Sequence, residues 1–490
     1  MKMMPVEILV ALGFPTRRPA QPCQPHRDAR HRAGQFGWWL WLGLLLAGVQ
    51  PGRAYTHSGN IYTTDGSFAD TQAAVGRARN GSIIQLPAGN FTWGHKRDRL
   101  YLARAVTLQG AGTNQTIITL PHDSQDYYGN GVITFMAPAT VKNLQIAASD
   151  SPATAFTGAA NGWRITGVLC DNRWGPYYVQ TTGYGLIDHC TFVGANGSDE
   201  MIFCYGPANS WQTLDSLGTT NAVVIEDCRF TGSGYVCDAN ANARIVVRFC
   251  TITGPIKIDG HGVASDTPPR AVRQMEAYDN HWTSKGQGGA WDSLEIRGGT
   301  GIFFNNAVDD NTFLGRGIIQ LKEYGCLAAW PNFGKVFQTP KDYPIKDQVG
   351  VGKDPKAGGS DPAYLWNNTK AGAPQTLSWA EIPGGALAQY AGATGQASAT
   401  FTMQDLIKAD RDYFNQTTGS FDGSTGVGIG SKAQMLAITA TKLNVGFWVT
   451  NEGSWNTTLP PDTSGRLYTW NGGAWALKYT PLTYPHPAAR

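Results

Sequence analysis

The chain has 490 residues, with 39 basic and 36 acidic side chains and 60 glycines. Charged residues make up 15%, against about 25% in an ordinary globular protein, so polarity comes mainly from uncharged side chains. Without residues 1–54 the chain holds 39 − 7 = 32 basic and 36 − 2 = 34 acidic side chains. This balance offers no basic stripe for nucleic acid, and an uncharged polar surface suits contacts with sugars.

Residues 1–54 are predicted to form a leader for export. Arginines between Arg17 and Arg32 precede the apolar run Trp38–Val49, and small residues follow at positions 52 and 54. Twelve residues (49 − 38 + 1) are too few to span a bilayer comfortably and fit the apolar part of a signal peptide. We therefore expect a secreted, periplasmic or cell-surface protein with no transmembrane domain after leader cleavage. An uncleaved N-terminal anchor is the alternative.

A helix and three short strands are predicted after the leader. Phe68–Arg79 has the apolar spacing of a helix, and Asn80-Gly81 ends it. The strands lie in the runs SIIQLPAG, VTLQGAG and TIITL, which begin at Ser82, Val106 and Thr116. A helix at this place would cover the open end of a stacked β structure, where unpaired strand edges are otherwise exposed.

Seven segments between residues 140 and 308 follow one template, in which an alternating apolar run is followed by a small or amide residue. The residues at this shared position are Leu144, Val168, Cys190, Cys228, Cys250, Asn280 and Asn306. The intervals between them are 24, 22, 38, 22, 30 and 26 residues. Coils of this size must stack on their neighbours to bury their apolar face. Residues 55–330 are therefore predicted to be an all-β solenoid, a parallel β-helix.

The same segments resemble a known superfamily. The small helix followed by GSIIQLPAGNFTW, VTLQGAG and TIITL resembles the N-terminal entry of the pectate-lyase-like superfamily of right-handed parallel β-helix proteins. The runs GLIDHCTFVG, VVIEDCRFTG and IVVRFCTITG resemble its coil repeats. The resemblance covers residues 58 to 325 and implies a right-handed parallel β-helix with an N-terminal helical cap. It leaves the chemistry open, because one fold hosts many functions.

The shared coil position predicts two side-chain stacks. Its three cysteines are expected to be buried thiols, and Cys204 and Cys237 are expected to share a second position. Disulfides between stacked coils are the alternative in an oxidising compartment. Asn280 and Asn306 predict a ladder of amides that hydrogen-bond along the stack, whereas two unrelated turn asparagines are the alternative.

The repeat fades beyond residue 330. Residues 331–420 are predicted to be loops that wrap the β-helix, with a short helix at Met403–Phe414. Residues 421–490 are rich in Trp and Tyr, and Asn471-Gly472-Gly473 is typical of a β-hairpin turn. We predict a small aromatic-rich β unit there, which is either a C-terminal cap or a separate module.

One strand of each coil carries an unusual density of charge. In the aligned runs YVCD, IKID, LEIR and IQLK, the first and third residues are apolar and should point inward. Two outward columns are then predicted, Val236, Lys257, Glu295, Gln320 and Asp238, Asp259, Arg297, Lys322. Neighbouring parallel strands lie about 4.8 Å apart, so these side chains would form a patch the size of one or two sugar rings.

The cations of this patch suit chemistry on an acidic polysaccharide. Arg297 could neutralise a uronate carboxylate, and Lys257 or Lys322 could remove the adjacent proton. His261 begins the loop beside the patch. These four residues are the catalytic candidates for a lyase that acts by β-elimination.

The remaining polar residues suggest binding roles. Asp238 and Asp259 on neighbouring rungs would repel each other unless a cation lies between them, so Ca²⁺ is the cofactor that this pair predicts. Glu295 and Gln320 are candidates for contacts with the substrate. Trp211, in the long insertion at 206–220, could stack on a sugar ring.

Two alternatives remain open for the charged strands. They could form a ladder of surface ion pairs, or the protein could be a non-catalytic glycan-binding protein, adhesin or surface scaffold. Gly260-His261-Gly262 resembles one element of pectin-hydrolysing glycosidases, but the paired aspartates that should precede it are missing. Whether the protein is an enzyme is therefore undecided from the sequence. We expect a monomer.

Overall fold

The computed structural model describes residues 55–94, 98–121, 131–148, 154–172, 178–194, 200–262, 270–283, 293–309, 318–323, 347–352, 360–374, 377–381 and 402–490. They belong to one compact unit that begins at Gly52. The predicted leader lies outside these residues. Within the described ranges, no helix has both the length and the apolar character needed to cross a membrane.

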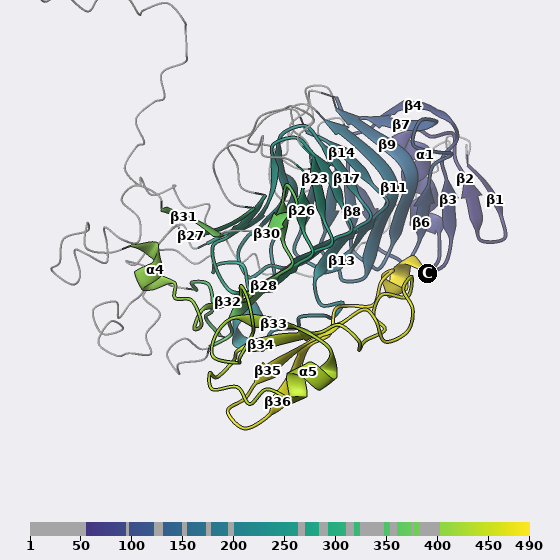
Figure 1. Cartoon of the computed structure of the whole chain (residues 1–490). Helices are drawn as coiled ribbons and strands as arrows, with labels where there is room; N and C mark the ends of the chain where they lie inside the picture. The colour runs from purple at the N-terminus through teal and green to yellow at the C-terminus, as the bar shows by residue number, and fades with distance from the viewer. Residues whose placement is uncertain are drawn as a thin grey trace, which may run out of the picture. The chain divides into compact units, whose positions relative to one another are not determined.

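Each coil contributes strands to three parallel series, which we call sheets 1, 2 and 3 (Figure 1). Sheet 1 contains β3 (Ile83–Gln85), β6 (Thr107–Gln109), the first halves of β9 (Thr140–Ala148) and β11 (Trp163–Asn172), β13 (Gly185–Asp188), β16 (Val223–Glu226), β19 (Arg244–Arg248), β22 (Gln274–Tyr278), β25 (Thr300–Phe304), β28 (Ala363–Trp366) and β32 (Tyr413–Asn415). The prediction of a parallel β-helix is confirmed.

Sheets 2 and 3 complete each coil. Sheet 2 contains β4 (Gly89–Thr92), β7 (Thr116–Thr119), the second halves of β9 and β11, β14 (Thr191–Val193), β17 (Arg229–Thr231), β20 (Thr251–Thr253), β23 (His281–Thr283), β26 (Ala307–Val308) and β29 (Thr369–Lys370). Sheet 3 contains β5 (Leu100–Leu102), β8 (Ile133–Phe135), β10 (Phe156–Gly158), β12 (Val179–Thr181), β15 (Glu200–Cys204), β18 (Gly234–Ala239), β21 (Ile256–Gly260), β24 (Leu294–Ile296), β27 (Ile319–Glu323) and β31 (Leu377–Glu381).

The N-terminal end has the predicted helix, α1 (Phe68–Arg77). Ser67 caps it, because its side chain accepts a hydrogen bond from the backbone N–H of Asp70. Ala74 and Val75 are buried in the same apolar cluster as the first coils. Beside it, β1 (Thr56–Ser58) and β2 (Ile61–Thr63) form an antiparallel hairpin, and β2 pairs in parallel with β3, the first strand of sheet 1.

A left-handed residue separates sheet 1 from sheet 2 in eight coils and explains the shared position of the repeat. These residues have φ between 52° and 59° and are Asn143, Gly167, His189, Asp227, Phe249, Asp279, Asn305 and Asn367. Asn and Asp tolerate this conformation better than most residues with a side chain. The residue that follows each of them is buried, which gives the column predicted from the sequence.

The predicted asparagine ladder is confirmed and gains a third member. The amide of Asn280 donates to Oδ1 of Asn306 at 3.0 Å, and the amide of Asn306 donates to Oδ1 of Asn368 at 2.8 Å. Each amide also donates to a backbone carbonyl of a neighbouring coil, at 2.8 to 3.0 Å. The buried amides are therefore satisfied along the stack.

The cysteines that the structure describes are buried thiols. The six described ones, Cys170, Cys190, Cys204, Cys228, Cys237 and Cys250, are all free. The prediction that Cys204 and Cys237 share one position was wrong, because Cys204 pairs with Ala239 and Cys237 with Ile202. Cys23 and Cys326 lie outside the described residues.

The β-helix extends beyond the boundary predicted at residue 330. Within 331–420, where we predicted loops and one helix, β28, β29, β31 and β32 continue the three sheets. β30 (Ala373–Pro374) folds back on β29. The predicted helix is short, α4 (Met403–Leu406), because the chain enters β32 seven residues later.

The predicted C-terminal β unit is confirmed as a four-stranded sheet. It consists of β33 (Val427–Gly430), β34 (Gly446–Val449), β35 (Arg466–Trp470) and β36 (Trp475–Tyr479), with α5 (Lys432–Leu436) after β33. The predicted hairpin joins β35 to β36. We call residues 421–490 the C-terminal module.

This module covers the outer face of sheet 1. Apolar residues of that face, Leu186, Val224, Val246, Ile302 and Tyr364, form one buried cluster with Val445, Trp448, Trp455, Leu467 and Tyr479 of the module. Polar contacts reinforce the junction. Arg248 is fully buried, is ion-paired with Glu226, and donates to the backbone carbonyl of Thr483 at 2.9 Å.

Candidate functional site

The outer face of sheet 3 carries the charged side chains that the sequence predicted, but it is buried. Asp238, Asp259, Glu295 and Gln320 stand in one column on four successive strands. Their exposed fractions are 4%, 0%, 2% and 1%. The prediction of a solvent-exposed patch was therefore wrong, and we call this group with Lys257, Arg297 and Lys322 the charged cluster.

The predicted columns were also out of register at two places. A bulge in β18 turns Val236 into the core, so Tyr235 rather than Val236 lies opposite Lys257. The Lys257 ammonium lies 4.4 Å from the centroid of the Tyr235 ring, within the range of a cation–π contact. Asp259 lies opposite Glu295 instead of Arg297, a shift of two residues that keeps the same side chains on the outer face.

Three cations converge on Glu295. Lys257 and Arg297 contact its Oε2, the latter at 3.3 Å, and Lys322 contacts its Oε1. Burial opposes ionisation of this carboxyl, but the positive charges of Arg297, Lys257 and Lys322 outweigh it and lower its pKa to about 2. Glu295 is therefore a carboxylate at any ordinary pH, and it is held as an anion among three donors.

The two aspartates differ from Glu295. Oδ1 of Asp238 and Oδ1 of Asp259 are buried and have no hydrogen-bond partner among the described residues, while Oδ2 of Asp259 is paired with Arg297. Burial and the neighbouring charge of Asp259 raise the pKa of Asp238 well above its usual range. Burial also raises the pKa of Asp259, against the attraction of Arg297. The surroundings of Asp238 thus favour the neutral form of its carboxyl, in contrast to those of Glu295.

The described residues do not fit the predicted Ca²⁺ site. Calcium takes about six to eight oxygen ligands, and the described residues contain no group of three or more His, Cys, Asp or Glu side chains that could hold a metal ion. One oxygen of Asp259 is already occupied by Arg297.

The two candidate bases have different surroundings. Lys257 is 2% exposed, and although burial favours its neutral form, Asp259 and Glu295 raise its pKa. The pKa of Lys322 is lowered by burial and by Arg297, against the attraction of Glu295, and its side chain is 18% exposed. Lys322 is therefore the better candidate for a base.

His261 lies at the edge of the charged cluster. It directly follows β21, and its Nδ1 donates to the carbonyl of Gly262 at 2.7 Å. Burial and the positive charge of Arg297 lower the pKa of its imidazole, against the attraction of Asp259. This histidine is neutral at physiological pH.

Trp211 does not line the charged cluster. It is 1% exposed, its indole N–H donates to the carbonyl of Ala271 at 3.0 Å, and the Arg270 guanidinium lies 4.6 Å from its ring centroid. The insertion around it packs on sheet 1, where Gly218 donates to Glu276. The predicted stacking of Trp211 on a sugar is incompatible with this burial.

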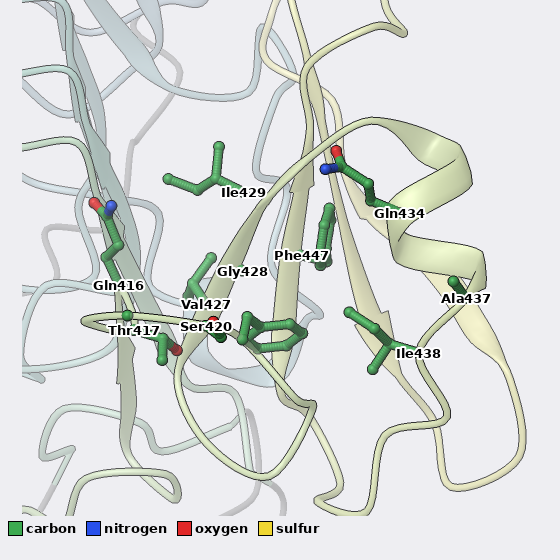
Figure 2. Close-up of a pocket in the computed structure, with 12 residues that line it drawn as sticks. Gln416, Thr417, Ser420, Val427, Gly428, Ile429, Gln434, Ala437, Ile438 and Phe447 are labelled. Carbon is green, nitrogen blue, oxygen red and sulfur yellow. The ribbon is translucent and has the colours of Figure 1, made fainter.

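A cavity of about 480 Å³ beside the C-terminal module was not predicted from the sequence. Figure 2 shows Gln416 and Thr417 on one side of it and Gln434, Phe447 and Ile438 on the other. These residues come from separate elements, so no local pattern marks them. The alternating glycines at 426, 428 and 430 are the one sequence signal that could have pointed to it.

Fold and cluster together define a parallel β-helix protein with a charged face on one sheet. No family model matches the chain, and no curated protein matches it. Three solved structures, each 13% identical, are similar to it. The first is an alginate lyase from Paenibacillus sp. str. FPU-7, with a TM-score of 0.37 over 65% of this chain and 98% of that chain.

The other two are matched over less of their length. A variant of the catalytic domain of a GH87 alpha-1,3-glucanase, in complex with nigerose, has a TM-score of 0.31 over 63% of this chain and 64% of that chain. Geobacillus virus E2 ORF18 has a TM-score of 0.29 over 51% and 53%. At TM-scores this low, no residue role is transferred from any of them.

Proposed function

We propose that this protein binds an acidic polysaccharide on the outer face of sheet 3 and cleaves it by β-elimination. One observation carries the proposal: three cations surround a single carboxylate, and Lys322 among them combines partial exposure with a lowered pKa. The predicted leader would place this activity outside the cell, which N-terminal sequencing of protein recovered from the culture medium or periplasm would test.

The roles follow from the charges. A uronate carboxylate would pair with Arg297 beside Glu295, and the positive charge of this guanidinium would acidify the adjacent C–H. Neutral Lys322 would accept that proton. The electron pair of the C–H bond then forms the new C=C bond, and the glycosidic oxygen leaves with the electrons of its C–O bond. This oxygen takes up the proton from Lys322, directly or through water, so that the lysine returns to its neutral form. Each product is charge-balanced without an oxidant or a reductant.

The test uses alginate and polygalacturonate as substrates, with the ultraviolet absorbance of the unsaturated product as the readout. Lys322→Ala should lower kcat about 100-fold or more, the usual contribution of a general base. Lys432→Ala is the matched control, because Lys432 forms an exposed ion pair with Glu452 in the C-terminal module. Equal rates of product formation by wild type and Lys322→Ala would refute the assignment, provided that both show the same circular dichroism.

A second candidate function is glycan binding without cleavage, as in an adhesin or surface scaffold. The burial of Lys257, Asp259 and Glu295, all ion-paired, favours it, because such pairs can serve the fold alone. Affinity electrophoresis in gels that contain alginate distinguishes the two. Retarded migration without unsaturated product supports the binder, and unsaturated product supports the lyase.

A further inference from the structure

We propose that the cavity beside the C-terminal module is a binding site for an uncharged oligosaccharide, separate from the charged cluster. The cavity lies between the loop after β32, α5 and β34 (Figure 2). Its volume of about 480 Å³ is in the range of small-molecule binding sites, roughly 300 to 1,000 Å³. This site does not depend on the proposed lyase activity.

The lining has the composition that recognises a neutral sugar. Of the described residues that line the cavity, none is charged. Gln416, Thr417, Ser420 and Gln434 supply amide and hydroxyl groups that can pair with sugar hydroxyls, and Phe421 supplies a partly buried ring for the C–H face of a pyranose. A charged ligand would lose its hydration here without gaining a counter-ion.

Glycines on β33 let the cavity walls approach the strand. A Cβ at Gly428 would meet ring atoms of Phe421 at 2.5 Å and of Phe447 at 2.7 Å, and a Cβ at Gly430 would meet Oε1 of Gln434 at 2.5 Å. Because these positions have no side chain, the two rings and the amide pack directly over the backbone.

The polar groups are held in place before any ligand binds. Oε1 of Gln434 accepts a hydrogen bond from the backbone N–H of Ser431 at 2.7 Å, as part of the capping box of α5. Oε1 of Gln416 accepts one from the backbone N–H of Asn367 at 2.8 Å. A side chain fixed in this way loses little conformational entropy on binding.

A second cavity extends the first toward the β-helix. Its volume is about 380 Å³, and it shares Gln416, Thr417 and Gly419 with the first cavity. Trp366, Asn367, Asn368 and Asn415 also line it, and again none of the described lining residues is charged. Two adjoining cavities of this kind fit an oligosaccharide of two or three units better than a single sugar.

The experiment tests the site with a large side chain placed at the edge of the cavity. Ala437 lines the cavity, is exposed and has ordinary helical dihedral angles, so Ala437→Trp should block the site without disturbing the core. Ala437→Ser is the conservative control. Leu443→Ala is the control elsewhere in the module, since Leu443 is 56% exposed and is not among the lining residues.

Binding to the full chain is measured by isothermal titration calorimetry and saturation-transfer NMR with maltotriose, cellotriose, laminaritriose and nigerose, and with trigalacturonate as the charged probe. We expect at least one neutral sugar to bind, with affinity lowered about tenfold or more by Ala437→Trp and unchanged in the two controls. The proposal is overturned if none of the four neutral sugars binds at about 10 mM, if Ala437→Trp weakens the binding of trigalacturonate as much as that of the neutral sugars, or if Ala437→Trp binds the neutral sugars like wild type. Lys322→Ala should leave this binding unchanged, so the two proposals fail separately.

Discussion

The pH dependence of stability should report on one buried carboxyl group, that of Glu276, which joins the β-helix to the C-terminal module. It accepts hydrogen bonds from the Tyr479 hydroxyl at 2.5 Å and from the backbone N–H of Gly218 at 2.9 Å. Burial raises its pKa to about 7, against the effects of these hydrogen bonds and of Arg248. The perturbation that isolates this group is Glu276→Gln, because an amide keeps the shape and does not titrate.

The magnitude follows from the two pKa values. The usual pKa is 4.5 and the pKa in the folded protein is about 7. One pKa unit corresponds to about 1.4 kcal/mol, so the group is linked to a free energy of about 3 to 3.5 kcal/mol. The folded state binds the proton more tightly than the unfolded state. The stabilisation is therefore complete below about pH 4.5, is lost as the pH rises toward 7, and changes no further above that.

The assay is urea denaturation of wild type and Glu276→Gln at several pH values between 4.5 and 8, followed by near-ultraviolet circular dichroism. The difference in unfolding free energy between the two proteins cancels the other titrating groups. We expect this difference to change by about 3 to 3.5 kcal/mol in favour of the variant as the pH rises. Glu452→Gln, at a partly exposed glutamate whose pKa is lowered, is the control. Parallel pH profiles for wild type and Glu276→Gln would show that the reasoning about burial is wrong.

Two further substitutions test the packing. Asn306→Ala removes the central amide of the ladder and leaves its buried partners on Asn280 and Asn368 unsatisfied, so it should lower the free energy of unfolding in urea by about 2 to 4 kcal/mol. The control Asn305→Gly, at the exposed neighbouring position, should lower it by less than about 1 kcal/mol. Equal losses of stability in the two variants would contradict the contribution of the ladder. Arg248→Met leaves the buried Glu226 carboxylate unpaired and should cost about 3 to 5 kcal/mol. It should also make residues 482–490 sensitive to carboxypeptidase, as mass spectrometry would show. An unchanged digestion pattern would contradict the idea that Arg248 holds the C-terminal segment on the β-helix.

The fold could be predicted because its signals are local and repeated. Each coil repeats the same pattern, in which an alternating apolar run is followed by a left-handed residue and then by a buried small or amide residue. Asn280 and Asn306 stood out because an amide in that buried position needs a partner of its own kind, and the neighbouring coil supplies one. Errors in a single coil do not change such a prediction, since the other coils repeat the pattern.

The charged cluster was only partly predictable, because alternation fixes which face a residue occupies and does not fix its partner. A shift by two residues between β21 and β24 leaves every side chain on the same face, so Asp259 was assigned to the outer face correctly and to the wrong neighbour. The bulge at Val236 breaks the alternation itself. In the sequence, only the apolar side chain at this expected outward position indicated the bulge. Burial of the cluster has no counterpart in the local sequence.

By contrast, the sequence of the strands in sheet 1 indicates where the C-terminal module packs. In β16 and β19 consecutive residues are apolar, Val223-Val224-Ile225 and Ile245-Val246-Val247, so both faces of these strands must be covered. The solenoid interior covers one face, and Trp448, Trp455 and Leu467 of the module cover the other. Removing residues 421–490 would therefore expose an apolar stripe along sheet 1 and leave Arg248 without its carbonyl partner at Thr483. The module is thus part of the folding unit, and both candidate sites have to be tested in a chain that retains it.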